Sequence, residues 1–280
     1  MLSRTVQNRP SARSISNGYQ LSAATGLHQG DRQQQQDQVI LLAHPYITGC
    51  VMGVVADGMG GLAGGRKASD QVIRTAEQLF DRYQPETDHP AELLHQIAKQ
   101  ADTLIKLTAI TTEQQPHSTL ATFLITPDGT CWCAHSGDSR ICYFHGKMLL
   151  KRTHDHSYVQ TLVDQGQLTE EEAAVHPQSN VLTSCLGMKP EPKLDIFRIR
   201  QLNIGDTLLA CSDGLWHYFT TQELGWVVSS LPPRDASQLL IHKARERAMG
   251  YGDNLSLVIV RIDRLKPEKK AAASQLASLN

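Results

Sequence analysis

The chain lacks an excess of charge of either sign and lacks long apolar runs, and both absences exclude classes of protein. Its 27 basic side chains are balanced by 28 acidic ones, which gives a formal net charge of -1. Proteins that bind nucleic acid carry a basic surface, and this composition does not supply one. No apolar run reaches the ~18 residues that a membrane-spanning helix needs. We therefore expect a soluble protein that binds neither nucleic acid nor membrane.

Cysteine is also sparse, and its spacing is unlike that of a disulfide or zinc framework. The sequence has six cysteines and no C-x-x-C pair, and most of them stand inside apolar runs. Small disulfide-bonded domains and structural zinc sites use closely spaced cysteines. We therefore expect buried thiols in a reducing compartment, and a cytoplasmic location.

Acidic residues are absent from the first thirty positions. Residues 1–18 hold arginines and serines, a composition typical of transit peptides, but Pro10 interrupts the helix that such a peptide would form. Residues 264–280 are rich in Lys, Ala and Ser. We expect disordered tails at both ends, which leaves one domain over 19–263.

Hydrophobic periodicity divides this domain into groups of helices and groups of strands. Apolar residues keep helical spacing over 66–83 and 94–104, and a second helix pair is predicted after Thr220 and from Pro233. Strands are predicted at 118–125, 130–134, 141–144, 193–199, 207–211 and 255–262. Because helices come in pairs between groups of strands, we expect a layered α+β sandwich with mostly antiparallel sheets.

The stretch 155–193 carries no strong strand signal. It holds short helical pieces, one of which starts at a capping box formed by Thr169 and Glu172. We expect this stretch to form a mobile flap.

Acidic turns are the strongest chemical signal in the chain. Four aspartates each lie next to a glycine at the end of a predicted strand, namely Asp57, Asp138, Asp213 and Asp253. If these ends converge and Asp37 joins them, the carboxylates repel, by about 4 kcal/mol for two charges ~4 Å apart at an effective dielectric near 20. Such a cluster needs cations, and oxygen ligands favour Mg²⁺ or Mn²⁺ over zinc. The planar guanidinium of Arg32 suits a phosphate bound beside the metals.

The glycines after Asp57 also fit three other interpretations. An Asp-Gly pair after a strand is commonly only a turn. Gly58-x-Gly60-x-x-Ala63 imitates a dinucleotide fingerprint, but no parallel βαβ pattern follows. Gly60 to Gly65 is spaced like a P-loop, but Arg66 stands where the lysine is needed. Context therefore disfavours nucleotide binding.

Eight motifs then occur in a characteristic order. They are Arg32-x-x-Gln35-Gln36-Asp37, Val55-Ala56-Asp57-Gly58-Met59-Gly60-Gly61, Ser118-Thr119-Leu120, Gly137-Asp138-Ser139-Arg140, Asp155-His156-Ser157, Asn180-Val181-Leu182-Thr183, Ser212-Asp213-Gly214-Leu215-Trp216 and Asp253-Asn254. In this order the chain resembles the metal-dependent serine/threonine protein phosphatases of type 2C, the PPM family, and in particular their compact bacterial branch. The resemblance runs from about residue 19 to residue 263, which would form the catalytic domain.

The resemblance implies a four-layer α-β-β-α sandwich, with two sheets flanked by helix pairs and a two-metal centre at one edge. Asp57 would bridge two Mg²⁺ or Mn²⁺ ions, and Gly58 would contribute its carbonyl oxygen. Asp213 and Asp253 would hold one ion, and Asp37 would act on the other, partly through water.

The resemblance also implies roles for three more residues and for one segment. Asp138, with Asp213, would recruit a third and weaker metal. Arg32 would bind the substrate phosphate, and Asn254 would orient the site. The segment 155–187 would correspond to the flap that influences substrate choice.

The implied reaction is hydrolysis of phosphoserine and phosphothreonine on proteins. A metal-bridging hydroxide would attack phosphorus directly, so that Arg32 and Asp57 are the catalytic residues and no phosphoenzyme forms. The implied partners are phosphorylated proteins, the products of a serine/threonine kinase, and we expect a monomer.

Departures from the family pattern leave alternatives open. Gln35-Gln36 replaces the usual pair after the arginine, and Met59 stands where animal members carry histidine, which leaves the leaving-group acid unassigned. His154 and His156 are either ordinary loop residues or groups near the leaving group, and Trp216 is expected in the core. An inactive phosphatase-like module that binds phosphoproteins is the main alternative, and a hydrolase of small phosphate esters would share the same chemistry.

Overall fold

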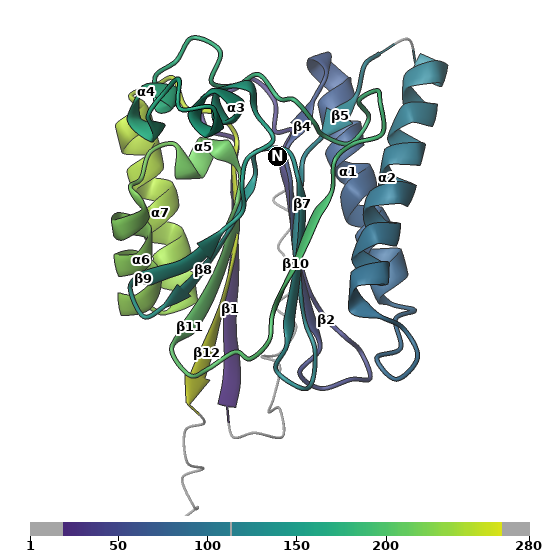
Figure 1. The fold of residues 1–280 in the computed structure, drawn as a ribbon, viewed down its shortest axis with the longest axis vertical. Helices are drawn as coiled ribbons and strands as arrows, with labels where there is room; N and C mark the ends of the chain where they lie inside the picture. Colours follow the sequence, from purple (N-terminus) through teal and green to yellow (C-terminus); the bar gives the residue numbers. More distant parts are fainter. Residues whose placement is uncertain (1–18, 113, 265–280) are drawn as a thin grey trace, which may run out of the picture.

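Two five-stranded antiparallel sheets pack face to face between two layers of helices (Figure 1). The computed structural model describes residues 19–112 and 114–264. The first sheet has the order β1 (Tyr19–His28), β12 (Leu255–Arg264), β11 (Asp206–Cys211), β8 (Arg140–His145), β9 (Met148–Arg152). The second has the order β10 (Asp195–Ile199), β7 (Cys131–Ser136), β6 (Leu120–Ile125), β3 (Val51–Ala56), β2 (Gln38–Ala43). A two-residue strand β4 (Gly58–Met59) pairs with β5 (His117–Ser118).

Helices cover the outer face of each sheet (Figure 1). The second sheet is covered by α1 (Gly61–Phe80) and α2 (Pro90–Thr112), and the first by α5 (Asp213–Trp216), α6 (Thr221–Ser230) and α7 (Pro233–Ala248). The arrangement is the predicted four-layer α-β-β-α sandwich. None of the helices in the described ranges combines the length and the apolar character needed to cross a membrane.

Three apolar cores hold the layers together. Alternate residues of the inner strands, such as Val55, Phe123 and Val258, are buried between the sheets. Their neighbours along the strands face the helices, so that Leu124 packs on α1 and α2 while Ile259 packs under α6 and α7. All six cysteines are buried and unbonded, as the sequence predicted.

The helix boundaries follow local sequence signals, with two corrections. Capping boxes start α6 at Thr220 and the short helix α4 (Glu170–Ala174) at Thr169, as predicted. The predicted helix at 66–83 instead begins at Gly61, directly after the glycine turn. The helix predicted at 94–104 is longer, because α2 runs from Pro90 to Thr112.

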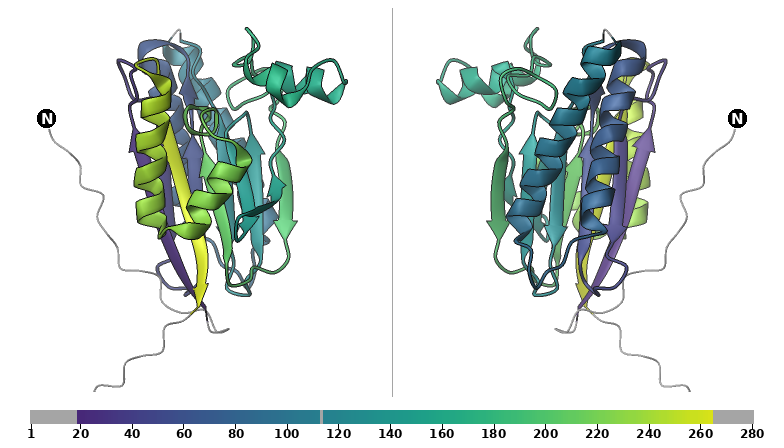
Figure 2. Two further views of the ribbon diagram at one scale, coloured as in Figure 1. Left: turned by 90° about the vertical axis from the view of Figure 1, so that its left-hand side faces the viewer. Right: turned by 90° about the vertical axis from the view of Figure 1, so that its right-hand side faces the viewer.

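The predicted flap lies at one end of the sandwich. It contains α3 (Tyr158–Asp164) and α4, which project beside the other layers in the side views (Figure 2). Apart from two isolated bridges, the described residues between β9 and β10 form no strand. The tails expected at 1–18 and 264–280 lie outside the described residues, except residue 264, which ends β12.

Candidate metal centre

Asp37 is the most enclosed of the five predicted carboxylate ligands, with 1% of its surface exposed. Its Oδ2 accepts hydrogen bonds from the hydroxyl groups of Ser212 (2.7 Å) and Ser256 (2.8 Å). Its Oδ1 is buried, and no group in the described part of the chain hydrogen-bonds to it. Since an unpartnered buried carboxylate oxygen is costly, this atom is available to a ligand.

Asp57 follows β3 directly and is fixed through its backbone by Thr119. Its N–H donates to Thr119 Oγ1 (2.9 Å), and its carbonyl oxygen accepts from the Thr119 N–H (2.8 Å). The next residue, Gly58, packs so tightly that a Cβ there would lie 2.0 Å from the carbonyl oxygen of Gly65. Only glycine fits this position, because any side chain would collide with the backbone at Gly65. The residue after Asp57 is therefore restricted to glycine by packing.

Asp213 and Asp253 come from adjacent strands of the first sheet. Asp213 follows β11 and Asp253 precedes β12, and because these strands are antiparallel the two carboxylates lie at the same end. Besides burial, the charge of Asp213 raises the pKa of Asp57, so these two carboxyl groups lie near each other. The ends of the two sheets therefore meet at this pair.

Arg32 lies beside the cluster and is engaged by Asp253. Its Nε donates to Oδ1 (2.8 Å) and its second guanidinium nitrogen, Nη2, donates to Oδ2 (2.6 Å). This two-pronged hydrogen bond raises the pKa of Arg32. Arg32, predicted to bind the phosphate, and Asp253, predicted to bind a metal ion, are thus paired with each other in this structure.

Burial and mutual repulsion raise the pKa of the carboxyl groups in the cluster. Burial raises the pKa of Asp57 well above its usual value, and the charges of Asp37 and Asp213 add to this effect. Burial also raises the pKa of Asp37 to about 7, against the lowering effect of its two hydroxyl donors. The pKa values of Asp138 and Asp213 are raised by the same two causes. Nearby cations would favour the ionised forms.

Asn254 holds the loop that carries Arg32 against the cluster. Its Oδ1 accepts from the N–H of Gln36 (2.7 Å), and its Nδ2 donates to the carbonyl oxygens of Gln29 (2.8 Å) and Gln34 (3.0 Å). The Gln35 side chain accepts from the N–H of Asp37 (2.8 Å). The glutamines of this loop therefore help to fix the backbone on either side of Asp37.

Asp138 is held through its own backbone and through that of the residue before it. Trp216 Nε1 donates to the Asp138 carbonyl oxygen (3.0 Å). The Trp216 ring stacks on the Arg140 guanidinium (3.4 Å from ring centre to Cζ), and Arg140 makes a bidentate ion pair with Asp155. Trp216, which the sequence placed in the core, is half-buried, packs against the core beneath α6 and α7 and also contacts the site.

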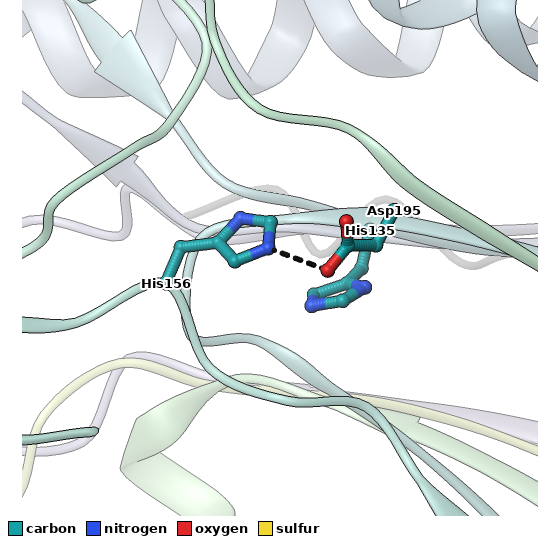
Figure 3. Close-up of side chains that lie close together, drawn as sticks. All are labelled: His135, His156 and Asp195. Atoms are coloured by element: carbon teal, nitrogen blue, oxygen red, sulfur yellow. Dashed lines mark hydrogen bonds and ion pairs between the residues drawn. The ribbon is translucent and has the colours of Figure 1, made fainter. Parts of the chain in front are cut away.

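His156 hydrogen-bonds to the backbone of the turn before Asp138, and its side chain forms a cluster with those of His135 and Asp195 (Figure 3). Its N–H donates to the Gly137 carbonyl oxygen (2.9 Å), its Nδ1 accepts from the Gly137 N–H (3.3 Å), and its Nε2 meets Asp195 Oδ2 (3.1 Å). Burial lowers the pKa of His135 to about 4 and also lowers that of His156. Both rings are therefore neutral near pH 7.

The three ligand atoms of this histidine cluster lie within 4.8 Å of one another, the only such triplet among the described residues. Its hydrogen bonds argue against a metal. A metal on His156 Nε2 would require a proton on Nδ1, which faces the Gly137 N–H. Asp195 Oδ2 also bonds Lys193 (3.0 Å). We interpret the cluster as a structural group that holds the turn carrying Asp138 in place.

The aspartate cluster, in contrast, fits divalent cations. Its ligand atoms are carboxylate oxygens, Asp37 Oδ1 is buried and unpartnered, and burial together with the neighbouring carboxylates raises the pKa of Asp57. Within the described ranges, no three aspartates bring carboxylate oxygens within 4.8 Å of one another. Asp253 is instead held by Arg32 in this structure, and it would have to turn towards Asp57 and Asp213 to share an ion with them.

A cavity of about 360 Å³ opens beside the cluster. Asp138 and Asp213 form part of its wall, and the flap forms the opposite side. Its lining thus joins the candidate metal centre to the predicted substrate-selecting segment.

The sandwich and its buried aspartates define a metal-dependent protein phosphatase. A family model described as protein phosphatase 2C matches residues 27–239. The chain therefore belongs to the protein phosphatase 2C family, whose members are metal-dependent serine/threonine protein phosphatases that act on phosphoproteins.

Relatives of known name agree with this assignment. The chain is 32% identical over 218 residues to the protein phosphatase PhpP of Streptococcus pneumoniae, a match that covers 77% of this chain and 87% of that protein. It is 35% identical over 162 residues to the serine/threonine phosphatase PstP of Mycobacterium tuberculosis, which covers 58% of this chain and 31% of that longer protein.

Solved structures share the fold. The M. tuberculosis phosphatase PstP/Ppp superposes with a TM-score of 0.74 at 29% identity, covering 87% of this chain and 99% of that one. The catalytic domain of PstP in complex with two manganese ions gives a TM-score of 0.71 at 28% identity, covering 87% and 98%.

The structure brings together all of the predicted site residues and adds several that the sequence did not reveal. Ser256, for which the sequence predicted no role, donates to Asp37, as does Ser212. His156 and Trp216 act on the backbone around Asp138. Ser212, His156 and Trp216 lie in motifs that are visible in the sequence and Ser256 lies in none, and the contacts of all four depend on segments that are separated in the chain.

Proposed function

We propose that this chain hydrolyses phosphoserine and phosphothreonine on proteins with two divalent cations held by its aspartate cluster. The observation that carries the proposal is the buried, unpartnered Oδ1 of Asp37 among carboxyl groups whose pKa values are raised by burial and by one another. Such a group is stable in ionised form only beside positive charge. Arg32 next to the cluster supplies a planar donor for phosphate.

The proposed ligands follow from the carboxylate positions. Asp57 would bridge two ions with help from the Gly58 carbonyl oxygen, Asp213 and Asp253 would hold one ion, and Asp37 would act on the other. Asp138, with Asp213, would hold a third and weaker ion. Mg²⁺ and Mn²⁺ both suit these oxygen donors, and the PstP complex with two manganese ions supports Mn²⁺.

The cations, when bound, would lower the pKa of a water molecule and offset the charge of the phosphate. Arg32 would exchange Asp253 for two phosphate oxygens and so orient the phosphoryl group. This exchange also frees Asp253 to act as a ligand. Met59 offers no proton to the leaving serine or threonine, so no side chain is assigned as general acid.

The two alternatives differ in what they require. An inactive phosphoprotein-binding module has no use for five intact carboxylates, and no finding favours it. A hydrolase of small phosphate esters would share the metal centre but would not need the flap-lined cavity. We further propose a cytoplasmic monomer that opposes a serine/threonine kinase.

The test of substrate class compares matched peptides carrying phosphoserine, phosphothreonine or phosphotyrosine, together with p-nitrophenyl phosphate, in Mn²⁺ or Mg²⁺. We expect phosphate release from the first two peptides at a higher kcat/KM than from the phosphotyrosine peptide. Turnover of p-nitrophenyl phosphate alone, with no release from any peptide, would instead indicate a small-ester hydrolase.

A further inference from the structure

The cavity between the flap and the first sheet has a lining unlike that of the metal centre. One side is formed by Trp216 and Phe219 near α5, and the other by Val159, Val163 and Ala173 of the flap helices α3 and α4. Apolar walls of this kind exclude water from a bound side chain. A volume of about 360 Å³ is ample for one long amino-acid side chain.

The charges around these walls are not balanced. The lining includes five carboxylates and two guanidinium groups. Two of the carboxylates, Asp138 and Asp213, belong to the proposed metal centre. The guanidinium groups are both engaged, Arg140 with Asp155 (2.7 Å) and Arg152 with Glu170 (3.2 Å).

Glu171 is the carboxylate that this pairing leaves over. It lies in the first turn of α4 and is exposed. Among residues 19–112 and 114–264, no group forms a hydrogen bond or ion pair with its side chain. The cavity therefore combines an apolar floor with one free negative charge at its flap side.

We propose that this cavity binds a lysine or arginine side chain of the phosphoprotein substrate, close in sequence to the phosphorylated residue. The inference rests on the proposed phosphatase function and names a preference of the same site. The aliphatic stem of the basic residue would lie along Trp216 and Val163, and its charged end would reach Glu171. An acidic side chain would meet Glu170 and Glu171 instead and be repelled.

The distance along the substrate is limited by the wall that the cavity shares with the metal centre. Because Asp138 and Asp213 line both, we place the basic residue close to the phosphorylated one, within about two residues at roughly 3.3–3.6 Å of extended chain per residue. A basic residue further away would pass the cavity without entering it.

The test measures binding separately from turnover. Fluorescent peptides carry a non-hydrolysable phosphonate analogue of phosphothreonine, with Arg, Gln or Glu at one of the four nearest positions. Their Kd values are measured by anisotropy with the full chain in Mn²⁺. At one position at least, we expect the Arg peptide to bind about two- to fivefold more tightly than the Gln peptide, the range for an exposed ion pair, and the Glu peptide to bind most weakly.

Three variants then locate the preference. Glu171→Gln should reduce it, and Glu171→Lys should abolish or invert it. Glu77→Lys is the matched control, because Glu77 is also exposed on a helix but lies outside the cavity, and it should leave the preference unchanged.

Two results would overturn the subsite. One is equal Kd values for the Arg, Gln and Glu peptides at all four positions, and the other is a ranking that Glu171→Lys does not alter. Failure of the wild type to hydrolyse p-nitrophenyl phosphate in any metal would count against the proposed function alone, since the Kd ranking still decides the subsite.

Discussion

Arg32 and Asp253 are bound to each other by two parallel hydrogen bonds of 2.8 and 2.6 Å, although they stand 221 positions apart in the sequence. Each is needed elsewhere in the proposed reaction, Arg32 at the phosphate and Asp253 at a metal ion. Both side chains are partly exposed, so the pair is screened by solvent and is readily exchanged. Binding of cations and phosphate should therefore break it.

Replacement of Arg32 should weaken phosphate binding even when the positive charge is kept. Arg32→Lys keeps the positive charge but cannot form the planar fork, so we expect a fall in kcat/KM of about 10-fold or more for p-nitrophenyl phosphate. The inhibition constant for inorganic phosphate should rise in parallel. Arg74→Lys, an exposed arginine on α1, is the control. Equal phosphate inhibition of wild type and Arg32→Lys would contradict the assigned role.

The metal-free protein should lose stability as the pH rises towards 7. The pKa of Asp37 is raised to about 7, so the folded state retains a proton that the unfolded chain releases near pH 4. Stability contributed by this group is complete below pH 4 and is lost as the pH rises to 7. In excess chelator, thermal unfolding from pH 4 to 8 should therefore show wild type losing stability relative to Asp37→Asn, by the order of a few kcal/mol.

The buried His135 contributes the opposite slope, because burial lowers its pKa to about 4 and protonation of the unfolded chain near pH 6.5 favours unfolding. Asp37→Asn retains His135, so the difference between the two proteins isolates Asp37. Parallel pH profiles would show that Asp37 is not the buried acid described here.

Divalent cations should stabilise the fold through the cluster. At an Mn²⁺ concentration 100 times the Kd, one site adds about 2.7 kcal/mol to the free energy of unfolding. We expect a rise in Tm with Mn²⁺ for the wild type and a much smaller rise for Asp213→Asn. Asp235→Asn, an exposed change at the start of α7, should behave like the wild type. A rise of equal size in all three proteins would place the ions elsewhere.

The Trp216 indole should strengthen the binding of the third and weakest metal ion, because it holds the backbone of Asp138. Trp216→Phe removes the hydrogen bond from Nε1 to the Asp138 carbonyl oxygen and keeps an aromatic ring against Arg140. We expect a loss of about 1 kcal/mol in stability and a severalfold weaker final step in Mn²⁺ binding by calorimetry. Trp226→Phe, in an exposed tryptophan on α6, is the matched control and should leave all binding steps unchanged. A Trp216→Phe titration identical to that of the control would remove this role.

The sequence predicted the features that depend on local signals. Glycines beside Asp57 and Asp213 mark the ends of strands β3 and β11, although Gly58 lies in β4 and Gly214 in α5 rather than in turns. Thr169 and Thr220 mark helix starts through capping boxes that the structure confirms. The eight ordered motifs then identified the family and hence the two-sheet sandwich.

The sequence could not predict features that arise from long-range packing. The hydroxyls of Ser212 and Ser256 reach Asp37 across 175 and 219 positions. Strands β1 and β9 were not predicted, because each lies at an edge of its sheet and is only partly buried, which weakens the alternation of polar and apolar residues. The start of α1 was placed at Arg66, since glycines at 60–65 have low helix propensity.

The central claim is that Asp57 and the cations it binds carry out phosphate release. The most direct measurement is phosphate release from a phosphothreonine peptide by the full chain in Mn²⁺, then in excess chelator, beside Asp57→Asn and the control Asp235→Asn. We predict release by the wild type and the control that stops with chelator, and no release by Asp57→Asn from a folded sample. Release that persists in chelator, or half the wild-type rate in Asp57→Asn, would contradict the account.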